Sequence, residues 1–182
     1  MRKIILIMSL LLTVTAAEAD TNSNTEMVIN INKLSQDHWS ESEQRNVATV
    51  VDFVQKLMNE HNFDYILTHY NDNRYVQHNR NIPDKITGLV GFLEAFVEDY
   101  PDYRYDVKRI TVDGNYVTFH SHATLDKADR GDDEKGLNII DTWRLEDGKI
   151  VEHWDAIQAL DGFMRFYALL AGGDIENDNG VF

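Results

Sequence analysis

The sequence predicts one α+β domain in which helices come first and a mostly antiparallel sheet follows. Apolar residues recur at helical spacing between about residues 40 and 100, and they alternate with polar residues between about 103 and 156. The turn signals Asp113-Gly114 and Asp147-Gly148 divide the second region into hairpins. A chain of 182 residues with 43% hydrophobic residues can bury one core. Because helices and strands are segregated, we expect helices to cover one face of a curved sheet.

The helical region has clear start and stop signals. Ser40 and Glu43 have the spacing of a capping box, in which each satisfies a backbone N–H of the first turn. Pro101 blocks the continuation of the third helix. The expected helices cover residues 40–58, 63–70, 89–100 and 162–171, and the expected extended segments cover 74–79, 103–112, 116–125, 137–145 and 149–156.

The first residues resemble a secretory signal peptide. Arg2 and Lys3 precede an apolar run over 4–14, and an A-x-A site ends at Ala19. We therefore expect export to the periplasm or the medium after cleavage near Ala19, with no membrane contact afterwards; the alternative is a buried N-terminal helix. The expected division is a signal peptide (1–19), a flexible lead-in that includes the start of the first helix (20–45), the domain (46–171) and a flexible acidic tail (172–182).

Charge and composition exclude several classes of function. The formal net charge is −14, which disfavours binding to nucleic acid or to anionic membranes. The chain contains no cysteine, so thiol catalysis and thiolate metal sites are excluded.

Ionisable side chains fall on the predicted strands in a pattern that suggests a polar cavity. Alternation places His120 and His122 on one face of their strand, Asp141 and Trp143 on one face of the next, and His153 with Asp155 on the fourth. Such groups on an inner face cost free energy unless they are paired or hydrated. The sequence leaves open which face is the inner one.

Asp141 is the candidate acid/base residue. A buried carboxylate near imidazoles has a pKa closer to neutrality, which suits proton transfer. We expect His120 or His122 as its hydrogen-bonding partner. The alternative is that Asp141 pairs with Arg144 or with a nearby histidine only to hold adjacent strands together.

The motifs, taken in order, resemble those of the SnoaL-like branch of the NTF2-like superfamily over about Asn46 to Gln158. The matching segments are Tyr75-Val76-Gln77-His78-Asn79, Pro83-Asp84, Gly91-Phe92-Leu93, His120-Ser121-His122, Asp141-Thr142-Trp143-Arg144 and the closing hairpin from Glu146 to Gln158.

This resemblance implies an NTF2-like (cystatin-like) cone with helices packed on a curved sheet. It also implies acid/base chemistry at a carbon next to a carbonyl, of the aldol cyclisation or isomerisation type, without a metal or an organic cofactor. The implied partners are a hydrophobic, carbonyl-containing small molecule and a second copy of the chain in a homodimer. The expected catalytic residues are Asp141, His120 and His122, and the expected substrate-binding residues are His78, Tyr75, Trp143, His153 and Trp154.

Two other readings remain open. His120 and His122, two residues apart on one strand, are spaced to bind a metal ion together with a third histidine, as in a cupin first motif, although the second cupin motif is missing. Alternatively, Tyr75, Trp143, Trp154 and Phe163 line the pocket of a binding protein without catalysis. The acidic connection from Asp126 to Glu134 lacks the ligand spacing of an EF-hand.

Overall fold

The computed structural model of the protein describes residues 27–72, 74–170 and 175–181. The expected signal peptide and its cleavage site at Ala19 lie outside the described residues. The elements in chain order are α1 (Ile31–Leu34), α2 (Glu41–Val54), the π-helical turn η1 (Gln55–Asn59), α3 (Phe63–His69), β1 (Val76–Gln77), α4 (Lys85–Asp99), β2 (Arg104–Asp113), β3 (Tyr116–Thr124), the 3-10 turn η2 (Lys127–Asp129), β4 (Leu137–Glu146), β5 (Lys149–Ala159) and α5 (Gly162–Leu170).

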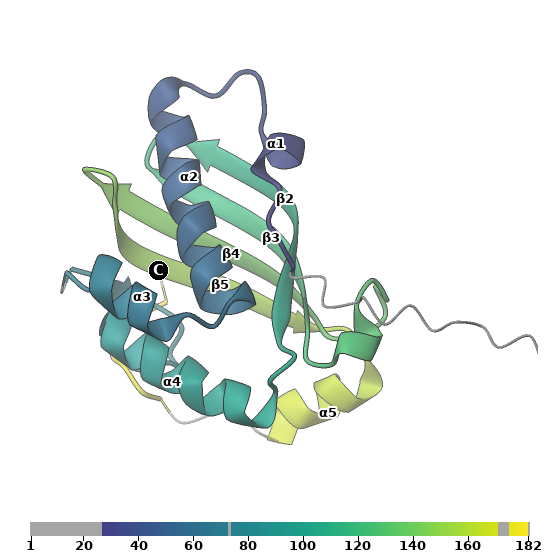
Figure 1. Cartoon of the computed structure of the whole chain (residues 1–182). Helices are drawn as coiled ribbons and strands as arrows, with labels where there is room; N and C mark the ends of the chain where they lie inside the picture. Colours follow the sequence, from purple (N-terminus) through teal and green to yellow (C-terminus); the bar gives the residue numbers. More distant parts are fainter. Residues whose placement is uncertain (1–26, 73, 171–174, 182) are drawn as a thin grey trace, which may run out of the picture.

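The five strands form one curved, unclosed sheet in the order β1-β5-β4-β3-β2 (Figure 1). Strands β2 to β5 form the expected antiparallel meander, and the short β1 joins its far edge in parallel with β5. The pairing register shifts at two places. One lies between Val107 and Arg109 of β2, in its pairing with β3, and the other lies between Arg144 and Leu145 of β4, in its pairing with β5. Such irregularities bend a sheet and increase its twist.

The helices cover one face of this sheet (Figure 1). Helix α2 begins at Ser40, whose hydroxyl accepts from the Glu43 N–H while the Glu43 carboxylate accepts from the Ser40 N–H, so the predicted capping box is present. Val47, Val50 and Phe53 of α2 are buried against the sheet. The inner sheet face contributes Val117, Phe119, Ile139 and Trp143 to the same core. The α+β arrangement predicted from the sequence is confirmed.

The structure differs from the predicted elements at the start of the chain and at the end of α2. Residues 31–34 form a short helix within the segment that was expected to be a flexible lead-in. Helix α2 ends in a π-helical turn that buries the side chain of Asn59. This side chain donates to the Tyr105 carbonyl and accepts from the Tyr105 N–H, and it therefore ties the helical layer to β2.

No helix in the described ranges is long and apolar enough to cross a membrane. Figure 1 places α5 beyond the end of β5.

Two glycines of α4 provide a test of the packing between this helix and the loop before it. A Cβ at Gly88 would lie 2.6 Å from the Pro83 carbonyl oxygen, whereas a Cβ at Gly91 would have no atom within 4 Å. We expect Gly88→Ala to lower the free energy of unfolding by about 1–3 kcal/mol because backbone must move. Gly91→Ala, the control, should raise it by about 0.5–1 kcal/mol through helix propensity. Urea unfolding of both variants measures this, and equal stability of the two would contradict the packing described.

Candidate active site

Strand register brings a set of polar side chains together on the inner face of the sheet. On β4 and β5, Asp141 pairs with Asp155 and Trp143 pairs with His153. On the other side of β5, Gln77 of β1 pairs with His153. Three strands therefore place Gln77, His153 and Asp141 on the face that the helices cover, with Asp141 diagonally across from His153.

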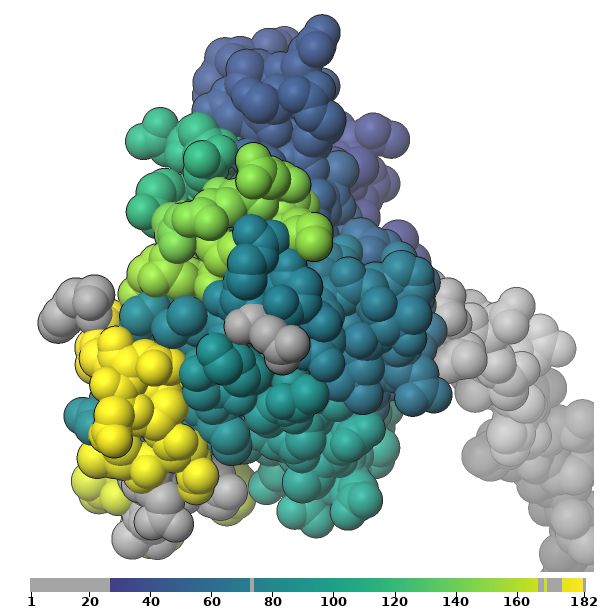
Figure 2. Space-filling model, turned by 90° about the vertical axis from the view of Figure 1, so that its left-hand side faces the viewer, coloured from purple at the N-terminus to yellow at the C-terminus, as the bar shows by residue number. Residues whose placement is uncertain are grey.

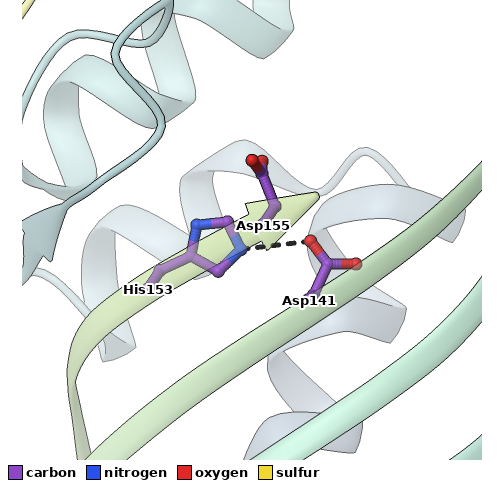
Figure 3. Close-up of side chains that lie close together, drawn as sticks. All are labelled: Asp141, His153 and Asp155. Carbon is purple, nitrogen blue, oxygen red and sulfur yellow. Dashed lines mark hydrogen bonds and ion pairs between the residues drawn. The ribbon is translucent and has the colours of Figure 1, made fainter. Parts of the chain in front are cut away.

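The centre of the site is a hydrogen bond between Asp141 and His153 (Figure 3). Asp141 Oδ1 lies 3.1 Å from His153 Nε2, and the two residues are only 2% and 6% exposed. Burial raises the pKa of the Asp141 carboxyl above its ordinary value, the contact with His153 opposes this rise, and the charge of Asp155 adds to it. A carboxylate whose pKa is raised in this way is a better proton acceptor than an exposed carboxylate.

A second row of hydrogen bonds supports this pair from β1. His153 Nδ1 lies 3.0 Å from Gln77 Oε1, and the same oxygen accepts from the Asn79 backbone N–H at 2.9 Å. Gln77 Nε2 donates to the Tyr75 hydroxyl at 3.2 Å. Asn79 Nδ2 donates to Asp155 Oδ2 at 2.7 Å. The segment 75–79 thus holds both His153 and Asp155 in place.

Two buried oxygen atoms in this region have no hydrogen-bond partner. They are Asp141 Oδ2 and Ser121 Oγ. Phe119 pairs with Asp141, so Ser121 lies diagonally across from Asp141 on the same face of the neighbouring strand β3. A buried polar atom without a partner costs free energy, so its presence calls for a bound water or ligand. A bound water or ligand would supply the hydrogen bond that each of these two atoms lacks.

Three tyrosine hydroxyls lie close enough to the two aspartates to be influenced by their charges. Tyr75, Tyr103 and Tyr105 are all buried. Burial raises the pKa of each hydroxyl, and the negative charges of Asp141 and Asp155 raise it further. These hydroxyls therefore stay protonated at neutral pH and remain hydrogen-bond donors.

The C-terminal segment 175–181 supports the site from outside (Figure 2, yellow against teal). Asn177 Nδ2 donates to the carbonyls of Asn79 and Ile82, and Asn179 Nδ2 donates to the Gln77 carbonyl. These bonds fix the backbone of Gln77 and Asn79, whose side chains contact His153 and Asp155.

The eight residues predicted for the site divide between the two faces of the sheet. The structure brings Asp141, His153, Trp143 and Tyr75 together on the inner face, with the rings of Trp143 and His153 centred 5.2 Å apart. The other four, His120, His122, His78 and Trp154, lie on the opposite face. His78 stacks on Trp154 at 4.6 Å and approaches Glu152.

The expected pairing of Asp141 with His120 or His122 is wrong. Strand β3 turns Val117, Phe119 and Ser121 inward, so both histidines point the other way. His120 Nε2 lies 2.7 Å from Asn138 Oδ1, and His122 Nε2 lies 2.7 Å from the Lys135 carbonyl oxygen. The sequence analysis gave Arg144 or a nearby histidine as alternative partners for Asp141. Arg144 contacts Glu152 and Glu146 instead, whereas His153 is the histidine that contacts Asp141.

Sequence reasoning overlooked four residues of the site, which are Gln77, Ser121, Tyr103 and Tyr105. Ser121 lies between the two histidines, so the same alternation that turns the histidines outward turns Ser121 inward. Tyr103 and Tyr105 also share a face by alternation. Gln77 lies in the Tyr75–Asn79 motif, but its role in the site depends on the parallel pairing of β1 with β5, which no local pattern predicts.

One set of side chains in the described residues is arranged as a possible metal-binding group. It consists of Asp141, His153 and Asp155, with one ligand atom from each lying within 4.8 Å of the others. His153 Nε2 is already bonded to Asp141, and Asp155 Oδ2 accepts from Asn79. His120 and His122, the metal ligands considered from the sequence, are not part of this group.

Comparison with known proteins decides the family. A sequence model of the SnoaL-like domain matches residues 50–153, which is more than half of the chain and includes Asp141 and His153. The chain belongs to the SnoaL-like family. No curated protein matches its sequence.

Several solved structures share the fold of this family member. A proposed polyketide cyclase from Bacillus cereus is 20% identical, with 66% of this chain and 79% of that chain covered and a TM-score of 0.54. AclR, a proposed hydroxylase from Streptomyces galilaeus, is 21% identical (72% and 98% covered, TM-score 0.54). A proposed SnoaL-like polyketide cyclase from Jannaschia sp. CCS1 is 17% identical (79% and 99%, TM-score 0.55). The α+β NTF2-like cone predicted from the sequence is confirmed.

The raised pKa of Asp141 leads to a prediction about stability and pH. The carboxyl binds its proton more tightly in the folded chain than in the unfolded chain, where its pKa is about 3.9. The stabilising contribution is therefore fully present below about pH 3.9 and is lost as the pH rises through the folded-state pKa. The Asp141→Asn variant has no carboxyl group at this position and therefore does not lose this contribution. Its free energy of unfolding, relative to that of the wild type, should increase with pH.

Urea unfolding at a series of pH values measures this difference. Asp133→Asn, in the exposed acidic connection, is the matched control and should show no comparable trend. A difference between Asp141→Asn and the wild type that stays constant with pH would contradict the raised pKa.

Proposed function

We propose that this SnoaL-like protein catalyses proton transfer at a carbon next to a carbonyl group of a small molecule, in an aldol cyclisation or an isomerisation, with Asp141 as the base. The observation that supports this most strongly is the state of the Asp141 carboxylate. One oxygen is held by His153, and the other is buried without a partner. This arrangement orients the carboxylate and leaves one oxygen free for a substrate proton.

The first step breaks a C–H bond next to the substrate carbonyl. The proton passes to Asp141 Oδ2, and the electron pair of the C–H bond becomes an enolate. Protonated hydroxyl groups stabilise the developing negative charge on the enolate oxygen. The buried hydroxyls of Ser121, Tyr75, Tyr103 and Tyr105 are the donors available on this face.

The second step returns the same proton. In an isomerisation, Asp141 delivers it to a different carbon of the extended enolate. In an aldol reaction, the enolate carbon attacks a second carbonyl carbon, and the resulting alkoxide takes the proton from Asp141. Both routes restore the carboxylate and need no other reactant, so one site supports either reaction.

Exchange of substrate protons for deuterium tests the proposal without knowledge of the final product. Purified protein is incubated in D₂O with a panel of cyclic and polycyclic ketones, and loss of the proton signal next to the carbonyl is followed by NMR. Asp141→Asn should slow the exchange by about 10²–10⁴-fold, because general-base catalysis of this kind has that magnitude. Substrate affinity should change little, since Asn keeps the size of the side chain.

His120→Gln is the matched control for this experiment. His120 lies on the opposite face of the sheet, so the exchange rate of this variant should stay within about threefold of the wild type, as expected for a substitution away from the site. Exchange that is equally fast in Asp141→Asn and in the wild type would refute the role of Asp141.

The second candidate function is a small-molecule carrier without catalysis. The rings of Trp143 and Tyr75 lie on either side of His153, which gives the site apolar walls with a few orienting polar groups. A ligand that binds with the same affinity to the wild type and to Asp141→Asn, and whose protons never exchange, would favour this carrier function.

The proposal includes a homodimer formed through the outer sheet face. Tyr116 and Ile140 are 48% and 38% exposed there, and the ring of Tyr116 lies near that of Trp154. An exposed apolar patch on an uncovered sheet is typical of an interface.

Ile140→Asp should therefore convert a dimer into a monomer, because a charge in the patch opposes its burial. Light scattering after size-exclusion chromatography measures the mass of each form. The exposed control Lys108→Ala, on β2 away from the patch, should remain dimeric, and a monomeric wild type at high concentration would contradict the interface.

A further inference from the structure

We infer that Gln77 is a positioning residue that keeps Nδ1 of His153 protonated, so that His153 and Asp141 share one proton between them and the pair is neutral as a whole. The inference concerns the ground state of the buried pair. Only its consequence for catalysis depends on the proposed function.

The orientation of the Gln77 amide is fixed at both ends. The Asn79 backbone N–H can only donate, so the Gln77 atom 2.9 Å from it must be the carbonyl oxygen Oε1. The amide nitrogen then faces the Tyr75 hydroxyl at 3.2 Å and donates to it. Gln77 is fully buried, and no solvent competes for either group.

This orientation determines the protonation of His153. Gln77 Oε1 has no hydrogen to donate, so His153 Nδ1, 3.0 Å away, must carry one. The other ring nitrogen, Nε2, faces Asp141 Oδ1 at 3.1 Å. One proton lies in that contact, either on His153 as an imidazolium beside a carboxylate or on Asp141 as a carboxylic acid beside a neutral imidazole. The pair has no net charge in either case.

Loss of this proton is opposed by Gln77. If Nδ1 keeps its hydrogen, the bare lone pair of Nε2 meets the negatively charged Asp141 oxygen. If the hydrogen moves to Nε2, the bare lone pair of Nδ1 meets Gln77 Oε1. Both arrangements place two acceptors in contact inside the protein, where such repulsion is poorly screened.

The surroundings of the pair act in the same direction. The other titratable groups that face it are Asp155 on β5, Tyr75 before β1, and Tyr103 and Tyr105 at the start of β2. The tyrosines are neutral, and negative charge on Asp155 favours a proton on the neighbouring pair. The helices on this face contribute apolar side chains such as Val50 and Phe53.

The consequence for catalysis concerns charge. A neutral pair is less costly to bury than an isolated carboxylate, yet it keeps Asp141 Oδ2 as a proton acceptor. When that oxygen takes a substrate proton, the pair becomes positive while the substrate becomes an enolate. The positive charge then stabilises the enolate at the moment when it forms.

Nitrogen-15 NMR of the histidine side chains tests the inference on the protein without a substrate. The His153 signals are assigned by their absence from His153→Gln. In the wild type at neutral pH we expect a protonated Nδ1, with Nε2 protonated or sharing its proton. A wild-type His153 with an unprotonated Nδ1 would overturn the inference.

Two variants at position 77 separate positioning from packing. Gln77→Met keeps the approximate size and removes the acceptor, so His153 should become the neutral tautomer with hydrogen on Nε2, and the pH at which the pair loses its proton should fall by about one unit or more. Gln77→Glu keeps an oxygen acceptor and should retain the protonated Nδ1. Loss of the wild-type pattern in both variants would show a merely structural role for Gln77.

The outcome is independent of the proposed function. If the NMR pattern is as expected but no deuterium exchange occurs, the proton is positioned as inferred and the catalytic proposal fails. If exchange depends on Asp141 while His153 Nδ1 is unprotonated, the proposed function stands and the role of Gln77 is wrong. Gln77→Met that unfolds leaves the wild-type and Gln77→Glu spectra as the deciding measurements.

Discussion

The hydrogen bond between Asp141 and His153 is the interaction on which the rest of the site depends. A carboxylate that is 2% exposed is stable only when another group balances its charge or shares its proton. His153 meets this need from the neighbouring strand, and it can do so only because β4 and β5 pair in one particular register. A shift of one residue would turn one of the two side chains to the outer face. The chemistry of the site is therefore set by backbone pairing as much as by side-chain identity.

Support for this pair comes from parts of the chain far away in the sequence. Gln77 and Asn79 reach it from the edge strand β1, which pairs in parallel with β5. The C-terminal segment holds that edge in turn, through Asn177 and Asn179. A two-residue strand has few hydrogen bonds of its own. These contacts therefore stabilise β1 next to His153 and Asp155, whose side chains it positions. Catalytic pairs require positions held to within a fraction of an ångström, and a second layer of hydrogen bonds achieves this.

Local patterns in the sequence were sufficient for the elements but not for the inner face. Capping at Ser40, the stop at Pro101 and the alternation along β3 to β5 are properties of neighbouring residues, and the structure contains them. Which face of β3 the helices cover depends on long-range packing. Val117 and Phe119 occupy the inner positions of β3, because burial of their apolar side chains in the core gains more free energy than burial of two imidazoles there. His120 and His122 are thereby turned outward.

The fold alone does not decide the reaction. A proposed hydroxylase and a proposed cyclase share this fold at about 20% identity, so the fold by itself does not specify the chemistry. In this chain the side chains on the inner face combine one unpartnered carboxylate oxygen, one unpartnered hydroxyl and several neutral tyrosines. Removing a proton from carbon requires a base and a donor for the resulting oxyanion, and the proposed function assigns these roles to Asp141 and the buried hydroxyls. A carrier needs neither a buried acid nor an unpartnered oxygen, and keeping them costs stability. That cost is the physical reason to prefer catalysis over binding.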